Sequence, residues 1–385
     1  MVKRIVLAFI ITALVLALFA FGVQTTTRSE DGIPIVQNGL KSALVKGKPV
    51  QLSLETDLVI DLEELRLAEA GLTEASCFDT DSKGNIYLIT ISNTGNNVFW
   101  FDTQGRYQGS FGRKGQGPGE LAYPAGVCAN SRDEIEVTDV RNRKLVVFKN
   151  DGSLVREVSN LGLLQVQPRA NGGYLAIESN YDSEAASTIH SIWVCDAGLK
   201  KFKKILEFPQ AFAPSGKITG VDPGIIWGGF NLNSIFVSGA PGQKYDVIRF
   251  DLNGKPIRRL RKDYGPVAIP GDYKARVRAG YSSAPDYLAM LDFPKYFPPF
   301  QGGFADDDGR LFVMTYERGA KPHEYIHDVF DPDGIFVARI AIDNHGTSGR
   351  SERPLFTIAR RGRIYNLREK EDGFKELVVR RMVWK

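Results

Sequence analysis

One short pattern returns six times along the chain and limits the folds that it can adopt. Each copy joins a tight turn, rich in Asp, Asn and Gly, to a run of alternating β-branched or aromatic residues. The copies are DSKGNIYLI (81–89), SRDEIEVTD (131–139), ANGGYLAIE (170–178), LNSIFVS (232–238), DDDGRLFVM (306–314) and RRGRIYNL (360–367). Turns followed by period-two alternation indicate β-hairpins, and their recurrence indicates a repeat architecture. We therefore expect an all-β repeat fold.

Most copies are followed by a second apolar strand that ends in another tight turn, and then by a further short strand. These second strands are VFWFDTQGR, LVVFKNDGS, IWVCDAGLK, VIRFDLNGK and DVFDPDGIF. Each unit thus holds four strands. Six such units predict a six-bladed β-propeller, whose radial repetition leaves only short, protected edges.

The sixth unit supplies only three strands, at 355–358, 363–367 and 374–384. The segment VQLSLETDLVID (50–61) alternates like a half-buried strand but has no hairpin partner nearby. We expect it to lie beside 374–384 as the missing outer strand and to close the ring. The expected organisation is a signal peptide or membrane anchor at 1–22, a linker of low order at 23–47 and the propeller at 48–385.

The stretch 111–152 resembles an NHL repeat, the blade unit of a family of β-propellers. The resemblance is carried by Phe111, Gly112, Gly117, Pro118, Gly119, Glu120, Pro124, Gly126, Val127, Asp139, Asn142, Arg143, Phe148 and Gly152. The segment FPKYFPPFQGGFADDDGRLFV (293–313) resembles part of the bacterial secreted six-bladed propellers related to NHL proteins. The resemblance implies a fold but no activity, because propellers host unrelated functions. It also implies that Asp139 and Arg143 brace a turn.

The N-terminus predicts export. Lys3 and Arg4 precede an apolar run from Ile5, and Ala20 and Gly22 are small residues suited to a cleavage site. The run 5–23 is also nearly long enough to span a bilayer, so an uncleaved anchor stays open. In both cases we expect a periplasmic or extracellular protein, with membrane contact only through 5–23 if uncleaved.

Charge and cysteine content exclude some classes of function. The 49 basic residues are balanced by 45 acidic ones, so no nucleic-acid partner is expected. Cys77, Cys128 and Cys195 show no metal or redox spacing. We interpret them as small buried side chains, with a single disulfide between Cys77 and Cys128 as the alternative.

Three motifs look functional but have simpler interpretations. HEYIH (323–327) matches a zinc-protease pattern, yet it lies on a predicted strand, where positions i and i+4 are about 13 Å apart. The loop GRKGQGPGE (112–120) is interpreted as a crossover between blades, with Arg113 and Lys114 at its tip available to an anion. DDDG (306–309) is interpreted as a hairpin turn. We expect no metal site and no cofactor.

Loop lengths predict which face is functional. The turns DSKGN, SRDE, DTQGR, KNDGS, DLNGK and DPDGI are tight and lie on one face of the ring. The loops at 91–97, 112–121, 179–190, 262–299 and 316–325 are long and lie on the other, which we call the long-loop face. Binding usually resides in elaborated loops on a rigid scaffold.

The largest of these loops, 262–299, is an insertion between blades 4 and 5 that carries many aromatic residues and a helix near Ser283 and Pro285. The aromatics either form a recognition surface or pack the insertion onto the blades. The candidate binding residues are Arg113, Lys114, Arg141, Tyr181, Tyr281, Tyr287, Tyr296, Tyr316 and Arg318.

Two functions follow from these observations. The leading one is an exported binding or scaffold module for a protein, peptide or glycan, because no nucleophile motif is present and His is scarce. The alternative is a metal-assisted lyase or hydrolase of the lactone or carbohydrate class at the central channel, as in some propellers of this broad class. A catalytic channel would gather acidic, Asn or His side chains around one point.

Overall fold

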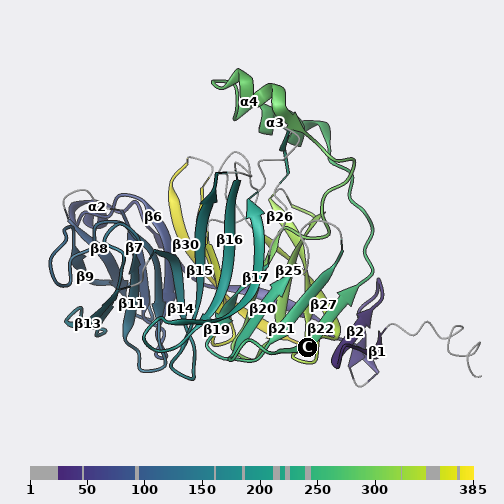
Figure 1. The fold of residues 1–385 in the computed structure, drawn as a ribbon, viewed down its shortest axis with the longest axis horizontal. Helices are drawn as coiled ribbons and strands as arrows, with labels where there is room; N and C mark the ends of the chain where they lie inside the picture. Colours follow the sequence, from purple (N-terminus) through teal and green to yellow (C-terminus); the bar gives the residue numbers. More distant parts are fainter. Residues whose placement is uncertain are drawn as a thin grey trace, which may run out of the picture.

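The predicted six-bladed propeller is confirmed in a computed structural model of the chain (Figure 1). The structure describes residues 25–45, 47–91, 95–159, 162–183, 187–210, 217–221, 226–238, 244–321, 323–343, 356–370 and 373–385. The predicted signal or anchor segment, 1–22, lies outside the described residues. Each blade is a sheet of at least four strands, which are antiparallel except where β2 (Ile33–Asn38) joins β22 (Pro256–Lys262) in blade 4.

In each of blades 1 to 3, the four strands follow one another in sequence. Blade 1 contains β6 (Ala75–Thr80), β7 (Ile86–Thr90), β8 (Asn96–Phe101) and β9 (Tyr107–Arg113). Blade 2 contains β10 (Pro124–Ala129), β11 (Ile135–Asp139), β12 (Lys144–Phe148) and β13 (Leu154–Ser159). Blade 3 contains β14 (Leu163–Pro168), β15 (Tyr174–Asp182), β16 (Ser187–Cys195) and β17 (Lys201–Gln210).

Blades 4 and 6 recruit strands from the N-terminal part of the chain. Blade 4 contains β19 (Trp227–Asn231), β20 (Ser234–Ser238), β21 (Asp246–Phe250), β22 (Pro256–Lys262), β2 (Ile33–Asn38) and β1 (Thr25–Glu30). Blade 5 contains β24 (Gly302–Ala305), β25 (Leu311–Arg318), β26 (Glu324–Phe330) and β27 (Phe336–Asp343). Blade 6 contains β28 (Phe356–Arg360), β29 (Arg363–Glu369), β30 (Lys375–Trp384) and β5 (Leu52–Asp61).

The ring closes as predicted. Strand β5 pairs antiparallel with β30 along its whole length, from Leu52 opposite Trp384 to Asp61 opposite Glu376. A short helix, α2 (Leu65–Glu69), follows this strand. The N-terminal strand therefore completes the last blade and joins segments that are far apart in sequence.

Each neighbouring pair of blades encloses one apolar cluster of buried side chains. At the seam between blades 6 and 1, Ile60, Leu367 and Leu377 pack with Phe78 and Phe101. All three cysteines are free, with Cys77 and Cys195 buried, so the disulfide alternative is not seen. Burial raises the pKa of the Cys77 thiol to about 12 and that of the Cys195 thiol to about 11.

The segment 23–47 was predicted to be a linker of low order, but it contains strands. Strands β1 and β2 form a hairpin there, and β2 pairs in parallel with the outer strand of blade 4, β22. Two short strands, β3 (Leu44–Val45) and β4 (Lys48–Pro49), form a further pair before β5. The hairpin is ordered because Ile35 and Val36 are buried against blade 4. In Figure 1 it lies on the outer side of the ring beside β22.

Asn38, at the end of β2, fastens this hairpin to two blades. Its side chain is completely buried. It donates to the carbonyl of Arg261 in blade 4 at 3.1 Å and to that of Gly334 beside blade 5 at 3.0 Å. Its oxygen accepts from the backbone N–H of Phe336 at 2.8 Å. One amide thus satisfies three backbone groups.

The tight turns share one internal brace, which explains their uniform length. In blade 1, an oxygen of Asp81 accepts from the backbone N–H groups of Lys83, Gly84 and Asn85 at 2.8 to 3.0 Å. Asp102, Asn130, Asp196, Asp251 and Asp331 make the same kind of contact in other turns. Short Asx side chains that bond the backbone two residues on are typical of such turns.

The turns also link neighbouring blades. The Ser82 hydroxyl donates to Asp133 of blade 2 at 2.6 Å, and the Asn231 amide donates to the carbonyl of Asp306 in blade 5 at 2.5 Å. The backbone N–H of Arg361 in blade 6 donates to Asp307 of blade 5 at 2.6 Å. These contacts join blade to blade around the tight-turn face.

Replacing Ile60 by Ala tests the closure. We expect the free energy of unfolding to fall by about 2–4 kcal/mol, because three buried side-chain carbons and their packing are lost at the seam. Val59→Ala is the matched control, since Val59 is exposed on the other face of the same strand. Denaturant titration of both variants measures the difference, and equal losses would contradict the closure role of β5.

Replacing Asn38 by Ala tests the hairpin. Three buried backbone groups would lose their partner, so we expect a loss of about 2–4 kcal/mol in unfolding free energy. Ser29→Ala, on the exposed strand β1, should change it by less than about 0.5 kcal/mol. Thermal or denaturant unfolding gives both values, and a stable Asn38→Ala protein would show that the hairpin does not clamp the blades.

Candidate functional site

The insertion between blades 4 and 5 forms a small lobe on the long-loop face. It contains α3 (Gly271–Ala279), α4 (Pro285–Met290) and β23 (Leu291–Asp292). Figure 1 shows both helices projecting beyond the ends of the blade strands. Pro285 begins α4 as predicted, but its N-cap is Ala284 without a side-chain bond, so Ser283 is not the cap. Helix α3 was not predicted.

The lobe has its own apolar core. Tyr273 and Val277 of α3 are buried with Ile269, Phe297 and Val221. Two strands fasten it from below, since β18 (Ile218–Thr219), in the crossover from blade 3 to blade 4, pairs in parallel with β23. Many of the insertion's aromatics therefore serve packing, as the alternative interpretation expected.

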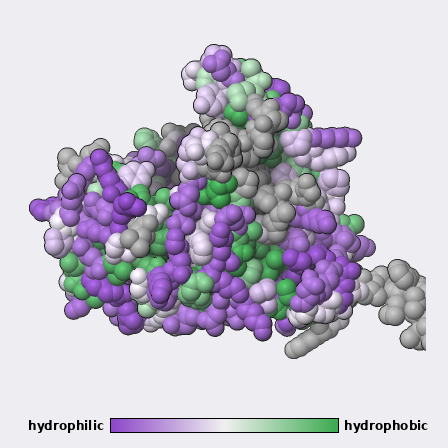
Figure 2. All heavy atoms as spheres, in the orientation of Figure 1, coloured by the Kyte–Doolittle hydropathy of each residue, from purple (hydrophilic) through white to green (hydrophobic). Residues whose placement is uncertain are grey.

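A second set of aromatics on the same lobe stays exposed or only partly buried. Helix α4 has no buried residue. The rings of Tyr281 and Tyr287 stack with centroids 6.4 Å apart and an interplanar angle of 20°. Tyr287 is 48% exposed and Tyr296 40% exposed. In Figure 2 this lobe mixes hydrophobic and hydrophilic spheres, whereas the opposite rim of the propeller is mostly hydrophilic.

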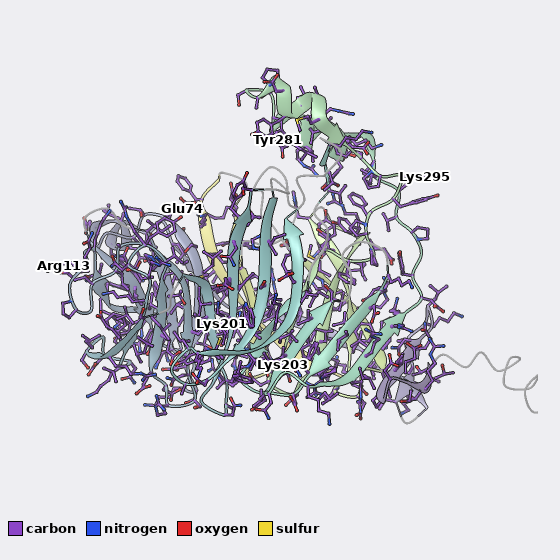
Figure 3. All side chains as sticks on the ribbon, viewed as in Figure 1. Glu74, Arg113, Lys201, Lys203, Tyr281 and Lys295 are labelled. Carbon is purple, nitrogen blue, oxygen red and sulfur yellow. The ribbon has the colours of Figure 1, made fainter. Side chains whose placement is uncertain are left out.

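Cationic side chains lie over two aromatic rings of the insertion, Phe293 and Tyr296. Arg278 lies 5.1 Å from the centre of the Phe293 ring, and Lys295 lies 5.1 Å from that of Tyr296. Figure 3 places Tyr281 on the lobe and Lys295 on the segment that leads back to blade 5. The lobe thus combines aromatic area with positive charge at its edge.

The other predicted binding residues do not join this surface. Figure 3 shows Arg113 at the far side of the propeller from the lobe. Arg113 and Lys114 belong to the crossover between blades 1 and 2, and Arg141 to a loop of blade 2. Tyr181 is 71% exposed but lies on β15, because β15 and β16 extend through most of the predicted loop 179–190. The candidates are therefore spread over several blades.

The glycine-rich crossover carries its own anion. The Glu120 carboxylate pairs with Arg113 and accepts from the backbone N–H of Gly117 at 2.9 Å. A Cβ atom on Gly115 would lie 1.9 Å from that carboxylate, so the glycine makes room for it. Hydrogen bonding from Arg113 lowers the pKa of Glu120. Arg113 thus already has an anionic partner within the crossover, and its contact with an external anion stays a prediction.

The structure corrects the prediction for Tyr316, whereas Arg318 is exposed and stays a candidate. Tyr316 is only 7% exposed and stacks on Phe297 at 4.0 Å, so it belongs to the lobe's core. Arg318 lies over the Tyr325 ring at 4.5 Å. Tyr316 thus attaches the lobe to blade 5, whereas the contact of Arg318 lies within blade 5.

The brace expected between Asp139 and Arg143 has a different partner. Asp139 is buried and accepts from the backbone N–H groups of Ala122 and Tyr123 and from the Asn142 amide at 2.7 to 3.1 Å. It therefore braces the crossover through Asn142 and the backbone.

The innermost strands hold a charged group that links three blades. Arg360 of β28 lies 3.6 Å from Asp79 of β6 and 3.8 Å from Asp307 beside blade 5. Burial raises the pKa of Asp79, although Arg360 acts against this shift. Within the described ranges, no group of three or more His, Cys, Asp or Glu side chains is arranged to hold a metal ion.

HEYIH lies where the strand interpretation placed it. His327 is inside β26, whereas His323 precedes the strand. His327 is buried, and its Nδ1–H donates to the Tyr325 carbonyl at 3.1 Å. Burial lowers the pKa of His327 to about 3. It is a neutral core residue rather than half of a metal site.

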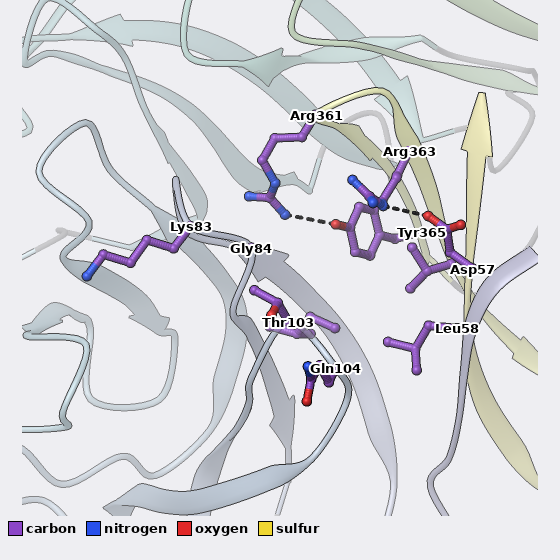
Figure 4. Close-up of a pocket in the computed structure, with 11 residues that line it drawn as sticks. Asp57, Leu58, Lys83, Gly84, Thr103, Gln104, Arg361, Arg363 and Tyr365 are labelled. Carbon is purple, nitrogen blue, oxygen red and sulfur yellow. Dashed lines mark hydrogen bonds and ion pairs between the residues drawn. The ribbon is translucent and has the colours of Figure 1, made fainter. Parts of the chain in front are cut away.

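A cavity that the sequence did not predict lies at the seam between blades 6 and 1. Its volume is about 590 Å³, and it opens among the tight turns, opposite the long-loop face. Arg361, Arg363 and Tyr365 of blade 6 line it together with Gly84 of blade 1 and Asp57 of β5 (Figure 4). Its lining comes from five separate segments of the sequence, so no local pattern could reveal it.

Comparison with known proteins supports the fold. Residues 80–192 match the model of a family described as 6-bladed beta-propeller. A segment of 59 residues is 41% identical to RING finger protein nhl-1 of Caenorhabditis elegans, which covers 15% of this chain and 6% of that protein. The chain thus spans only a small part of this relative's length.

Two solved structures share the architecture over nearly their whole length. A Bacteroides fragilis protein described as exported has a TM-score of 0.52 at 12% identity, covering 91% of this chain and 99% of that one. A Bacteroides vulgatus protein has a TM-score of 0.51 at 12% identity, covering 88% and 99%. The resemblance to bacterial six-bladed propellers is confirmed. Among the described residues, no helix has the length and apolar character needed to cross a bilayer.

Replacing His327 by Gln should remove a pH dependence of stability. The unfolded chain binds a proton near pH 6.5 and the folded chain only near pH 3. Between these values the unfolded state holds more protons, so lowering the pH destabilises the protein through His327 by up to about 1.4 kcal/mol per pH unit. Urea titrations from pH 8 to pH 4 should show the stability of wild type, relative to the variant, falling below pH 6.5. A constant difference would contradict this assignment.

Proposed function

We propose that this protein is an exported, non-catalytic binding module that recognises a protein or peptide through the lobe between blades 4 and 5. The observation that carries the proposal is the stacked pair Tyr281 and Tyr287 beside a helix that buries none of its residues. The propeller serves as the rigid scaffold that presents this lobe.

The exposure of α4 is unusual for a helix of its size. A helix of six residues is too short to be stable by itself in water, and such helices normally gain stability by burying an apolar face. Here Tyr287 lies at the surface, while the lobe's core is already filled by other aromatics. Tyrosine provides contact area at low cost in conformational entropy and is enriched among interface hot spots.

Arginine and lysine at the edge of the lobe favour a partner with acidic groups. Lys274 and Arg278 lie over Phe293, and Lys295 lies over Tyr296. Because cations already cover some of these rings, flat stacking of a sugar has fewer free faces, which favours a protein or peptide over a glycan.

Export is part of the proposal. The apolar N-terminal run and the likeness to a Bacteroides protein described as exported both support it. A mature N-terminus at Val23 would indicate a cleaved signal peptide, and an intact N-terminus in the membrane fraction would indicate an anchor. A periplasmic or cell-surface location follows in either case.

The lobe is tested with the double variant Tyr281→Ala/Tyr287→Ala. Partners are first identified by crosslinking in the exported fraction of cells, and the purified partner is then titrated against wild type and variant. We expect binding at least about ten-fold weaker, because hot-spot aromatics contribute about 2 kcal/mol or more. Tyr123→Ala, an exposed tyrosine outside the lobe, is the matched control and should bind like wild type.

Two results would overturn the proposal. One is equal affinity of wild type and double variant for the partner, with both proteins folded by circular dichroism. The other is a stoichiometric divalent metal in the purified protein, together with turnover of a lactone or carbohydrate substrate that the double variant retains. Capture of a glycan instead of a protein would keep the lobe as the site but change the ligand class.

A further inference from the structure

The seam cavity lies on the face opposite the lobe and has the dimensions of a small-molecule site. At about 590 Å³ it falls within the range of ligand pockets in proteins, roughly 300–1,000 Å³. Blade 6, including its outer strand β5, forms one wall. The turns of blade 1 that contain Gly84 and Thr103 form the other. Figure 4 shows Arg361 and Arg363 on the blade 6 side, with Tyr365 between them.

The lining carries more positive than negative charge. Lys83, Arg361 and Arg363 contribute three cations, and Asp57 contributes the single carboxylate. Asp57 is engaged by Arg363, whose Nε lies 2.8 Å from Oδ2. Figure 4 shows the Lys83 ammonium directed away from the cavity, so Arg361 and Arg363 are its inner cations.

Arg361 has only neutral partners for its guanidinium among the described residues. It donates to the Tyr365 hydroxyl at 2.8 Å and to the carbonyl of Asp81. The nearby Asp307 carboxylate is used by the backbone N–H of Arg361 and by Arg360. A partly buried cation without a carboxylate attracts an anion more strongly than one in open water.

The positive φ at Arg361 is a backbone conformation that favours Gly or Asn over Arg. Arg361 has a φ of 50°, and with Gly362 at 67° it forms the two-residue turn between β28 and β29. Such turns favour Gly or Asn, because side chains are strained at positive φ. Gly84 accommodates this arginine, since a Cβ atom there would lie 2.6 Å from the guanidinium. The chain thus keeps an arginine at a costly position and clears space for it.

The rest of the lining combines two neutral polar side chains, Thr103 and Gln104, with an apolar set. Leu58 of β5, Ile86 of β7 and Val379 of β30 contribute aliphatic surface, and Tyr365 contributes a ring. Polar groups that orient a ligand beside apolar surface are typical of small-molecule sites.

We infer that the seam cavity binds a small organic anion, with its carboxylate or phosphate at Arg361 and Arg363 and its apolar body against Leu58, Ile86 and Val379. The site is independent of the lobe. Since its walls belong to the first and last blades, a bound ligand also strengthens the closure of the ring.

The site is tested by isothermal titration calorimetry with four probes: inorganic phosphate, hexanoate, hexyl phosphate and hexanol. We expect hexanoate or hexyl phosphate to bind at one site and more tightly than inorganic phosphate, because only they fill the apolar wall. Hexanol should not bind. Preference between hexanoate and hexyl phosphate distinguishes a carboxylate ligand from a phosphate ester.

Three variants locate the binding. Arg361→Gly removes the guanidinium and places the favoured residue in the turn, and should weaken binding at least about ten-fold. Asp57→Asn frees Arg363 from its competing carboxylate and should tighten binding several-fold, a gain that misfolding cannot produce. Lys149→Ala, an exposed cation in a turn of blade 2, should leave affinity unchanged.

The inference fails if none of the anionic probes binds at about 10 mM, a concentration above that needed to detect even weak sites. It also fails if Arg361→Gly and Lys149→Ala bind a probe equally, or if Asp57→Asn brings no gain. Loss of lobe binding in the tyrosine variants leaves these titrations unaffected, so the two sites are tested separately.

Discussion

The antiparallel pairing of β5 with β30 is the contact on which the ring depends. A propeller has no central strand that belongs to all blades, so it is held together by the contacts between neighbours. Five of the six interfaces join blades that follow one another along the chain. The sixth joins the last blade to the first, and β5 reinforces it by completing the last blade and packing Ile60 into the cluster shared with blade 1.

The two faces of the ring divide structural and functional roles. On one face, Asx residues such as Asp81 brace turns of nearly fixed length, and contacts such as Ser82 to Asp133 join neighbouring blades. The opposite face is free of this requirement, and the crossover and insertion there differ in length. The seam cavity is an exception, because it opens on the braced face where two blades meet through Arg361.

The fold could be predicted because its signals are local and repeated. Each hairpin shows its turn residues and its alternation within about ten residues. The unpaired strand 50–61 could be assigned because the last blade was the one that lacked a fourth strand. The hairpin at 25–38 was missed because its partner, β22, lies more than two hundred residues away and because β1 is polar and mostly exposed. The site was predicted only in part. Exposed tyrosines could be placed in an insertion, but burial of Tyr316 and pairing of Arg113 with Glu120 depend on contacts that composition does not show.

The path of residues 25–61 around the outside of blades 4, 5 and 6 has a consequence for how the chain folds. This segment is made early, whereas its partner β30 is made last, and Ile60 and Leu377 pair across more than three hundred residues. Bringing such distant segments together is slow, because the entropy of a very long loop is lost before any contact forms. The blades can form one by one during synthesis, but β5 can pair only after β30 has been made. Once β5 has paired with β30, we expect unfolding to begin with the release of this pair. The ring should therefore be slow to unfold as well as slow to fold.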